Sequence, residues 1–233
     1  MLLSAIDAFE FMGTCFEAVE PAVIATILVG SQIFQVAAGA LIFPGGDARP
    51  RAAVVLMGIA RSFVTAADGR QLTVRYARRG ALVGKRSDEI GAHAPLAVQA
   101  LTDCTILELD RDLFLRTAER EISLANALVA ELSRRLDDVY ATVGDSAFGS
   151  LQQRVVRHLL ALVDHGAPDG VGRVRISQQQ LADAVGSSRE AVARVLATLR
   201  RDGHLRTGPR EIELMNVGAL VPLLSDWHRS SPY

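Results

Sequence analysis

Residues 176–199 read ISQQQLADAVGSSREAVARVLATL, and this stretch indicates the fold more clearly than any other part of the chain. Its apolar residues are spaced to bury one face of each of two short helices. These residues are Ile176, Leu181, Ala182, Val185, Val192, Val195, Leu196 and Leu199. Ser177, three residues before Gln180, begins a capping box, and Gly186 stands where the first helix must end in a sharp turn. Ser187 or Ser188 can cap the second helix, so the pattern predicts a helix-turn-helix.

The second predicted helix exposes Arg189, Glu190 and Arg194. An Arg side chain can donate two hydrogen bonds to guanine in the major groove, and Glu can accept one from cytosine. A helix-turn-helix places the start of its second helix against the base edges. The alternative is an ordinary helical hairpin with a solvated charged face. Because the apolar spacing, turn, cap and charged face all agree, these three residues are predicted to read DNA bases.

The segments ISQQQLA (176–182) and GSSREAVARVL (186–196) resemble the winged-helix DNA reader of the CRP/FNR superfamily, and SREAVAR resembles its catabolite-activator branch. RRDGHL (200–205) and EIEL (211–214) look like the wing, and a weaker likeness covers nearly the whole chain. The resemblance implies an α+β fold: an N-terminal antiparallel β-roll like a cyclic-nucleotide-binding domain, a long dimerisation helix and a C-terminal winged helix-turn-helix. It also implies GTGA half-sites, and hence a palindrome with TGTGA-like arms.

A second set of residues is predicted to contact DNA phosphates. A wing hairpin is expected over residues 206–214, across Gly208–Pro209. Residues 150–210 contain ten arginines and five acidic residues, a balance that suits phosphate contact. The predicted phosphate contacts are Ser177, Gln178, Gln179, Ser188, Arg206 and Arg210.

The composition limits the classes of protein to which the chain can belong. The 233 residues suffice for two modest domains, and a hydrophobic content of 49% with a net charge of −1 is typical of a soluble globular protein. The start lacks the pattern of a signal peptide, and no apolar run approaches ~18 residues, so a cytoplasmic protein without a membrane partner is expected. Cys15 and Cys104 are too few for a disulfide scaffold or a metal cluster. The superfamily's iron–sulfur sensors need four cysteines, so the resemblance argues against that branch.

The N-terminal half is predicted to be a β-roll. Glycines punctuate residues 33–109, and strands are predicted at 54–57, 61–65, 71–76 and 97–109, with a hairpin turn at 67–69. Regular spacing of this kind favours a small antiparallel barrel or roll. Asp110 is expected to cap a short helix that ends at Thr117. The predicted domains are a sensor domain at 1–118, a dimerisation helix with hinge at 119–149 and a DNA-binding domain at 150–233.

A long helix is predicted over residues 119–144. Its apolar residues recur at alternating spacings of three and four, which is a coiled-coil seam narrower than the stripe of a helix on a globular core. The seam, and thus the predicted dimer interface, consists of Ile122, Ala125, Val129, Leu132, Leu136, Val139 and Val143. A core helix of the barrel domain is the alternative, but palindromic sites go with two-fold protein symmetry. A hinge is predicted at 144–150, before a helix at 151–164 that Ser150 and Gln153 cap.

In the superfamily the β-roll binds a cyclic nucleotide whose phosphate is held by a helix N-terminus, an Arg and a small hydroxyl residue, while a Glu binds the ribose. Residues 79–84, RGALVG, resemble the start of this cassette. Lys85 then replaces the Glu, and Ala94 and Pro95 stand where the Arg and the Ser or Thr are expected. The predicted effector pocket comprises Val83, Gly84, Lys85, Ala94, Pro95, Val139 and Tyr140. Cyclic AMP is therefore expected to bind weakly or not at all.

The sequence is compatible with effectors other than cyclic AMP. Lys85, Arg86 and Arg79 would suit another anion, or they are surface charges. An apolar pocket that also includes Leu96 and Val98 would take an apolar effector or be filled by its own side chains. Some superfamily members bind haem through an axial His or Cys, and the candidates here are His93 and Cys104.

No catalytic constellation is visible, since Asp88 and Glu89 have no partners suited to acid–base chemistry. The chain is expected to be no enzyme, with no cofactor and no metal. The expected partners are double-stranded DNA, a second copy of the chain and RNA polymerase. The alternatives are a helix-turn-helix that acts through protein contacts, and an enzyme built on the barrel around a bound metal or cofactor.

Overall fold

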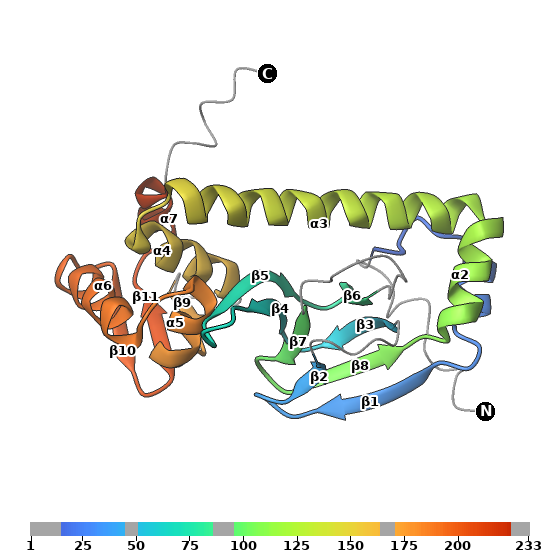
Figure 1. The fold of residues 1–233 in the computed structure, drawn as a ribbon, viewed down its shortest axis with the longest axis horizontal. Helices are drawn as coiled ribbons and strands as arrows, with labels where there is room; N and C mark the ends of the chain where they lie inside the picture. The colour runs from blue at the N-terminus through green and yellow to red at the C-terminus, as the bar shows by residue number, and fades with distance from the viewer. Residues whose placement is uncertain (1–14, 45–50, 86–95, 164–170, 225–233) are drawn as a thin grey trace, which may run out of the picture. The chain divides into compact units, whose positions relative to one another are not determined.

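The computed structural model describes residues 15–44, 51–85, 96–163 and 171–224. The chain divides into two compact units, Met1–Val64 with Arg75–Asp138, and Thr65–Val74 with Val139–Tyr233. Figure 1 labels the helices and strands of both units. No helix in the described ranges is long and apolar enough to cross a bilayer.

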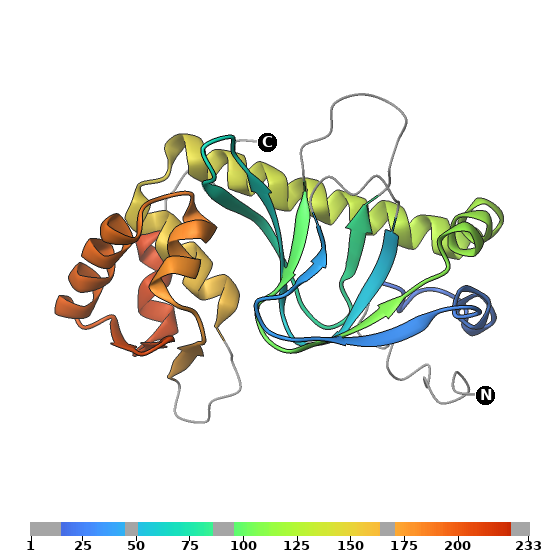
Figure 2. The same ribbon diagram turned by 60° about the horizontal axis from the view of Figure 1, so that its bottom comes forward.

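The first unit is a β-roll with helices against one of its sheets. The two four-stranded sheets have the strand orders β1-β8-β3-β6 and β2-β7-β4-β5. Figure 2 shows the curved strands of both sheets, and both contribute residues to one buried cluster. The strands are β1 (Gln32–Val36), β2 (Leu41–Phe43), β3 (Arg51–Met57), β4 (Ala60–Thr65), β5 (Gln71–Ala77), β6 (Leu82–Lys85), β7 (Ala97–Ala100) and β8 (Cys104–Glu108). The helices are α1 (Pro21–Ile27), α2 (Arg111–Arg120) and α3 (Ile122–Phe148). Helix α3 from Val139 onward, and residues 65–74 at the end of β4 and the start of β5, belong to the second unit.

Alternation along the strands gives this unit two cores. Val55 and Ile106 are buried in the cluster between the sheets, whereas their neighbours Val54 and Leu107 are buried in the cluster with the helices. Successive side chains of a strand point to opposite faces, so β3 and β8 supply both clusters. Leu124 of α3 is fully buried in the helical cluster, which attaches the start of α3 to the roll.

The predicted strands at 54–57, 61–65 and 71–76 lie within β3, β4 and β5. The predicted strand at 97–109 is wrong in one respect, because it is two strands in different sheets, β7 and β8, separated by residues 101–103. The turn at 67–69 is confirmed. Gly69 has φ +85°, and the Asp68 carboxylate accepts hydrogen bonds from the backbone N–H and the Nε of Arg70.

Helix α2 is longer than predicted, and the long helix predicted at 119–144 begins and ends later in the chain, as α3 at Ile122–Phe148. Asp110 caps α2 as expected, since its carboxylate accepts a 2.8 Å hydrogen bond from the N–H of Leu113, but α2 continues to Arg120. The prediction that residues 144–150 form a hinge is wrong for 144–148, because α3 runs through Gly144 to Phe148. A single Gly costs a helix only about 1 kcal/mol relative to Ala. The break comes at residues 149–150.

The second unit is a winged helix-turn-helix. Its elements are α4 (Leu151–Leu162), β9 (Gly172–Val174), α5 (Gln178–Val185), α6 (Arg189–Arg201), β10 (Leu205–Gly208), β11 (Glu211–Leu214), α7 (Val217–Leu220) and η2 (Val221–Leu223). The strands form one antiparallel sheet in the order β10-β11-β9. The capping box of Ser150 and Gln153 at the start of α4 is confirmed. Leu159, Leu181 and Leu199 are fully buried, so α4, α5 and α6 share a core.

Candidate nucleic-acid interface

The turn between α5 and α6 has the geometry that the sequence predicts. Ser177 and Gln180 exchange hydrogen bonds in a capping box at the start of α5. Gly186 ends α5 in the left-handed conformation, with φ 66° and ψ 37°, and the N–H of Ser187 donates to the carbonyl of Ala182 at 3.0 Å. This satisfies carbonyls that the helix end would leave unpaired. Ser188, rather than Ser187, caps α6 by accepting a hydrogen bond from the N–H of Ala191.

Gly186→Ala is expected to lower the free energy of unfolding by ~1 kcal/mol, because a left-handed backbone costs an L-residue with a Cβ roughly 1–2 kcal/mol. Gly186→Asn should lose less, since Asn tolerates this conformation better. Thermal unfolding of both variants measures the difference. An alanine variant as stable as the unmodified protein would show that the turn does not hold this geometry in solution.

Helix α6 has one buried and one exposed face. Val192, Leu196 and Leu199 are at most 2% exposed, so the helix orientation within this unit is fixed by packing. Arg189, Glu190 and Arg194 are all exposed, as predicted for base-reading residues. Glu190 and Arg194 are four residues apart and share one side of the helix, while Arg189 flanks them at its first position.

The Glu190 carboxylate interacts with the start of its own helix. Hydrogen bonds from its own backbone N–H and from the Ser188 hydroxyl lower the pKa of Glu190, and the charges of Arg189 and Arg194 add to this effect. Glu190 is thus ionised at neutral pH. An ionised carboxylate accepts hydrogen bonds only, which is the property that recognition of a cytosine amino group requires.

The residues predicted to contact phosphates lie at helix starts and in the wing. Ser177 and Ser188 are the N-caps of α5 and α6, and Gln178 and Gln179 form the first turn of α5. Helix N-termini favour anions because their first N–H groups lack partners within the helix. The Gln179 side chain donates to Asp183 at 2.8 Å.

The wing is the hairpin of β10 and β11, in which Gly208 pairs with Glu211. Arg206 is exposed on β10, and Arg210 is exposed in the turn, where its φ is +60°. Pro209 followed by a residue with positive φ is the pattern of a type II turn. Both arginines are therefore presented to solvent by a short, well-defined hairpin.

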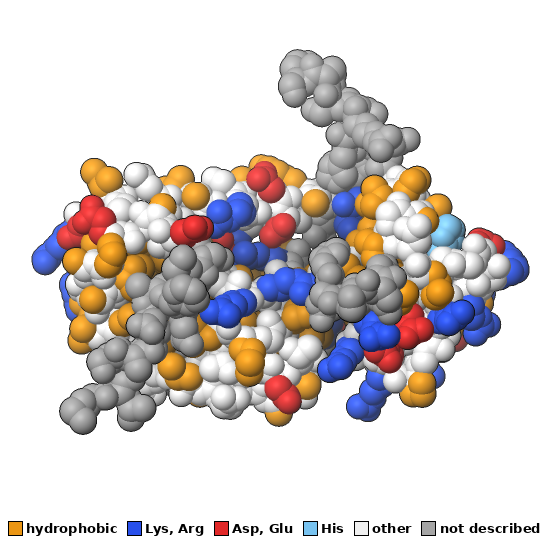
Figure 3. All heavy atoms as spheres, turned by 180° about the vertical axis from the view of Figure 1, so that it is seen from behind, with side chains coloured by type: hydrophobic (Ala, Val, Ile, Leu, Met, Phe, Trp, Pro, Cys, Tyr) orange, Lys and Arg blue, Asp and Glu red, His pale blue; other side chains and the backbone are white. Residues whose placement is uncertain are grey.

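The seam of α3 is exposed in the single chain. Ile122, Val129, Leu132, Leu136, Val139 and Val143 have exposed fractions between 38% and 79%, and Ala125 is half-buried. Figure 3 shows hydrophobic side chains along the edge that α3 forms. The side of α3 that packs on the roll is different and carries Leu124 and Ala127. This placement contradicts the alternative in which the seam is the core of the roll.

The residues predicted to line the effector pocket lie in different surroundings. Val83 and Val98 are 3% exposed in the core of the roll, and Gly84 is half-buried on β6. Val139 and Tyr140 are exposed on α3. Ala94 and Pro95, like Arg86 and His93, lie outside the described residues, and so does the side chain of Lys85.

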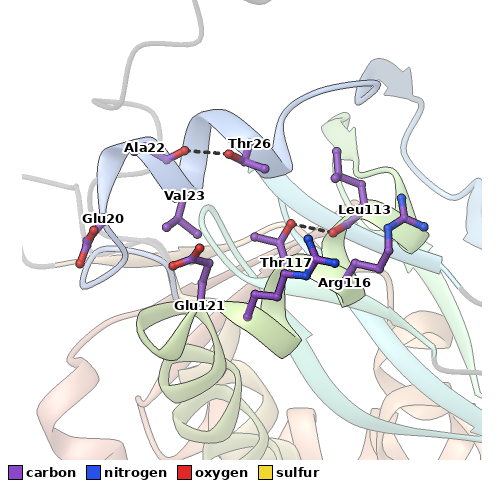
Figure 4. A pocket seen from close by; sticks show the side chains of 9 residues that line it. Glu20, Ala22, Val23, Thr26, Leu113, Arg116, Thr117 and Glu121 are labelled. Carbon is purple, nitrogen blue, oxygen red and sulfur yellow. Dashed lines mark hydrogen bonds between the residues drawn. The ribbon is translucent and has the colours of Figure 1, made fainter.

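A pocket of about 370 Å³ lies elsewhere in the first unit, between α1 and α2 (Figure 4). Two acidic residues, Glu20 and Glu121, and two arginines, Arg116 and Arg120, line it. The hydroxyls of Thr26 and Thr117 donate to the backbone carbonyls of Ala22 and Leu113. It is lined by Glu20, Ala22, Val23, Thr26, Leu113, Arg116, Thr117, Arg120 and Glu121, which include none of the predicted effector residues.

Neither described cysteine has the environment of a reactive thiolate. Burial, together with the charge of Glu131, raises the pKa of Cys15 to about 11. Burial also raises the pKa of Cys104, whose thiol donates to the carbonyls of Ile59 and Thr102. Cys104 therefore does not fit an axial haem ligand, which would need a free thiolate. Within the described ranges, no group of three or more His, Cys, Asp or Glu side chains could hold a metal ion.

A charged cluster that the sequence did not predict lies at the contact of α3 with the roll. It consists of Arg75, Glu131, Arg134, Arg135 and Asp138, with Glu131 almost completely buried at its centre. The spacing of the sequence does contain a signal for it: Leu124, Ala127 and Glu131 follow one another at three and four residues, on a different side of α3 from the seam.

Comparisons with known proteins agree with this architecture. Residues 33–121 match the cyclic nucleotide-binding domain model, and residues 153–223 match the Crp-like helix-turn-helix domain model. The chain is 32% identical over 166 residues to transcriptional regulator LdrP of Thermus thermophilus, which covers 70% of this chain and 82% of LdrP. It is 33% identical over 185 residues to the cyclic AMP receptor protein of Thermus thermophilus, covering 78% of this chain and 83% of that protein.

Solved structures show the same likeness. The c-di-GMP-responsive regulator CLP of Xanthomonas campestris is 26% identical, with a TM-score of 0.69, over 84% of this chain and 99% of that one. A CRP/FNR-family regulator of Thermus thermophilus is 28% identical, with a TM-score of 0.65, over 82% of this chain and 97% of that one. Fold and relatives together define a DNA-binding transcription regulator. The chain belongs to the CRP/FNR superfamily, as the residues around the helix-turn-helix indicate.

Proposed function

We propose that this regulator binds, as a homodimer, a palindrome whose arms resemble TGTGA, and that Arg189, Glu190 and Arg194 read the bases. The observation that carries the proposal is the exposed charged face at the start of α6, on a helix whose opposite face is completely packed. In a helix-turn-helix this part of the second helix enters the major groove. Arg189 and Arg194 would each donate to a guanine, and Glu190 would accept from a cytosine on the other strand.

Two such helices in a symmetric dimer require two half-sites. Their centres should be about 34–36 Å apart, one turn of the double helix. The exposed seam of α3 supports a dimer, since an apolar seam with a period of 3.5 residues is the pattern of coiled coils. The wing arginines Arg206 and Arg210 and the helix starts would contact phosphates and set the register.

Selection from random DNA, followed by binding measurements on single variants, tests the assignment. Arg189→Ala should lose ~1–3 kcal/mol of binding free energy and relax the preference at one G·C pair. Arg206→Ala should weaken binding to all sequences alike and reduce the salt slope by about one unit. Arg201→Ala is the matched control, because Arg201 is exposed at the far end of α6, beside Asp202. Selected sites without two-fold symmetry, or without a G·C pair in the arms, would overturn the assignment.

A second candidate is a ligand-gated sensor of the same superfamily. The match of residues 33–121 to the cyclic nucleotide-binding domain model favours it, and two relatives are named for cyclic AMP and c-di-GMP. Departures at Lys85, Ala94 and Pro95 argue that cyclic AMP itself is not the effector. RNA polymerase is the further partner that transcription regulation would require. Binding of the selected DNA by ligand-free protein separates a gated regulator from one that needs no ligand.

A further inference from the structure

We propose that the charged cluster around Glu131 holds α3 on the β-roll in place of a small-molecule ligand, so that the protein binds DNA without an effector. This inference rests on the proposed function. The residues that carry it are Arg75 of β5 and Glu131, Arg135 and Asp138 of α3. All of them belong to the first unit.

Glu131 is the centre of the cluster. Its side chain is 3% exposed, and Arg75 reaches its Oε1 at 2.9 Å from β5. Arg134 and Arg135, three and four residues further along α3, contact its two carboxylate oxygens at 2.9 and 3.1 Å. Arg75 also contacts Asp138 at 3.1 Å, so one guanidinium joins two carboxylates of the helix.

A second set of contacts joins α3 to strand β6 of the roll. Arg75 and Arg135 both donate to the backbone carbonyl of Leu82 on β6. The cluster therefore links α3 to two strands of the roll, one in each sheet. Arg134 differs from the other two arginines, because its described ion pair stays within α3 and its side chain is 56% exposed.

A buried carboxylate is costly unless it is paired and hydrogen-bonded. Burial acts to raise the pKa of Glu131, but the hydrogen bond from Arg134 and the contacts of Arg75 and Arg135 outweigh it, so the pKa of Glu131 is lowered. The ionised, packed arrangement is thus favoured at neutral pH. Moving α3 away from the roll would separate Arg75 from both of its carboxylate partners, Glu131 and Asp138.

A ligand shifts a conformational equilibrium only through contacts that favour one state over the other. Here the chain itself supplies such contacts between the roll and the helix that carries the seam. The seam residues lie on this same helix, α3, and α4 of the DNA-binding unit follows it directly in the chain. An effector that bridged the β-roll and α3 would therefore add little to the stability of their contact.

The test uses the whole 233-residue chain, freed of small molecules by refolding or extensive dialysis and checked by mass spectrometry. DNA affinity is measured by fluorescence anisotropy on the selected palindrome, and hydrogen–deuterium exchange is followed in β6 and in residues 131–138. The unmodified protein should bind without ligand. Arg75→Ala should raise exchange in both segments and weaken DNA binding by about tenfold or more, as the binding-competent fraction falls.

Arg134→Ala is the matched control, because it removes an arginine from Glu131 without cutting a described link to the roll, and it should change both readouts little. If Arg75→Ala does not fold, Arg75→Lys replaces it, since a lysine keeps the charge but cannot join Glu131, Asp138 and Leu82 together. Equal effects of the two alanine variants, or raised exchange with unchanged DNA affinity, would overturn the inference.

A ligand requirement of the unmodified protein would also overturn it, and would leave the proposed function intact provided that DNA binding appears when cyclic AMP, c-di-GMP or a cell extract is added. Failure of the proposed function is a separate result. In that case, selection would return no preferred sequence under any of these conditions.

Discussion

Leu132→Asp should convert the proposed homodimer into monomers. Leu132 is 59% exposed in the single chain and lies in the middle of the seam, between Val129 and Leu136. Pairing of two seams would bury an aspartate from each chain without a partner, which costs several kcal/mol per dimer. Size-exclusion chromatography with light scattering at micromolar concentration measures the mass directly. A monomer could occupy only one arm of the proposed palindrome, so the variant should also bind DNA more weakly.

Ala130→Asp is the control, because Ala130 is exposed on α3 outside the seam and receives the same charge. It should leave the dimer intact. The seam would be ruled out as the interface if the unmodified protein were a monomer at micromolar concentration. It would also be ruled out if both aspartate variants dissociated to the same extent.

Cyclic AMP should bind with a dissociation constant roughly 30- to 5,000-fold weaker than that of a site with the complete phosphate cassette. Loss of a charge-assisted Arg–phosphate pair at a partly buried position removes about 2–5 kcal/mol, at ~1.4 kcal/mol per factor of ten. Isothermal titration calorimetry measures the constant. Ala94→Arg combined with Pro95→Ser should recover part of the affinity. Micromolar or tighter binding by the unmodified protein would show that Ala94 and Pro95 are not the positions equivalent to the phosphate contacts.

Local interactions made the DNA-binding unit predictable. The capping boxes at Ser150 and Ser177 depend on residues three apart, and the turn depends on a single glycine at Gly186. Such features are set by sequence neighbours, so they appear in the sequence whatever the rest of the chain does. The seam of α3 was equally visible because its period, rather than any distant partner, identifies it.

Tertiary structure decided the features that depend on distant parts of the chain. The segment 97–109 reads as one strand, yet it forms β7 and β8 in different sheets, because sheet pairing depends on strands elsewhere in the chain. Gly144 suggested a hinge, but α3 continues through it, since a packed helix tolerates one glycine. The charged cluster is the clearest case. Charged residues are almost never fully buried unless they are paired, and the partner that buries Glu131 against the roll is Arg75, which lies on a distant strand. The sequence by itself determined the helix-turn-helix and the charged face of α6, whereas only the fold brought Arg75 to Glu131 and so joined α3 to the β-roll.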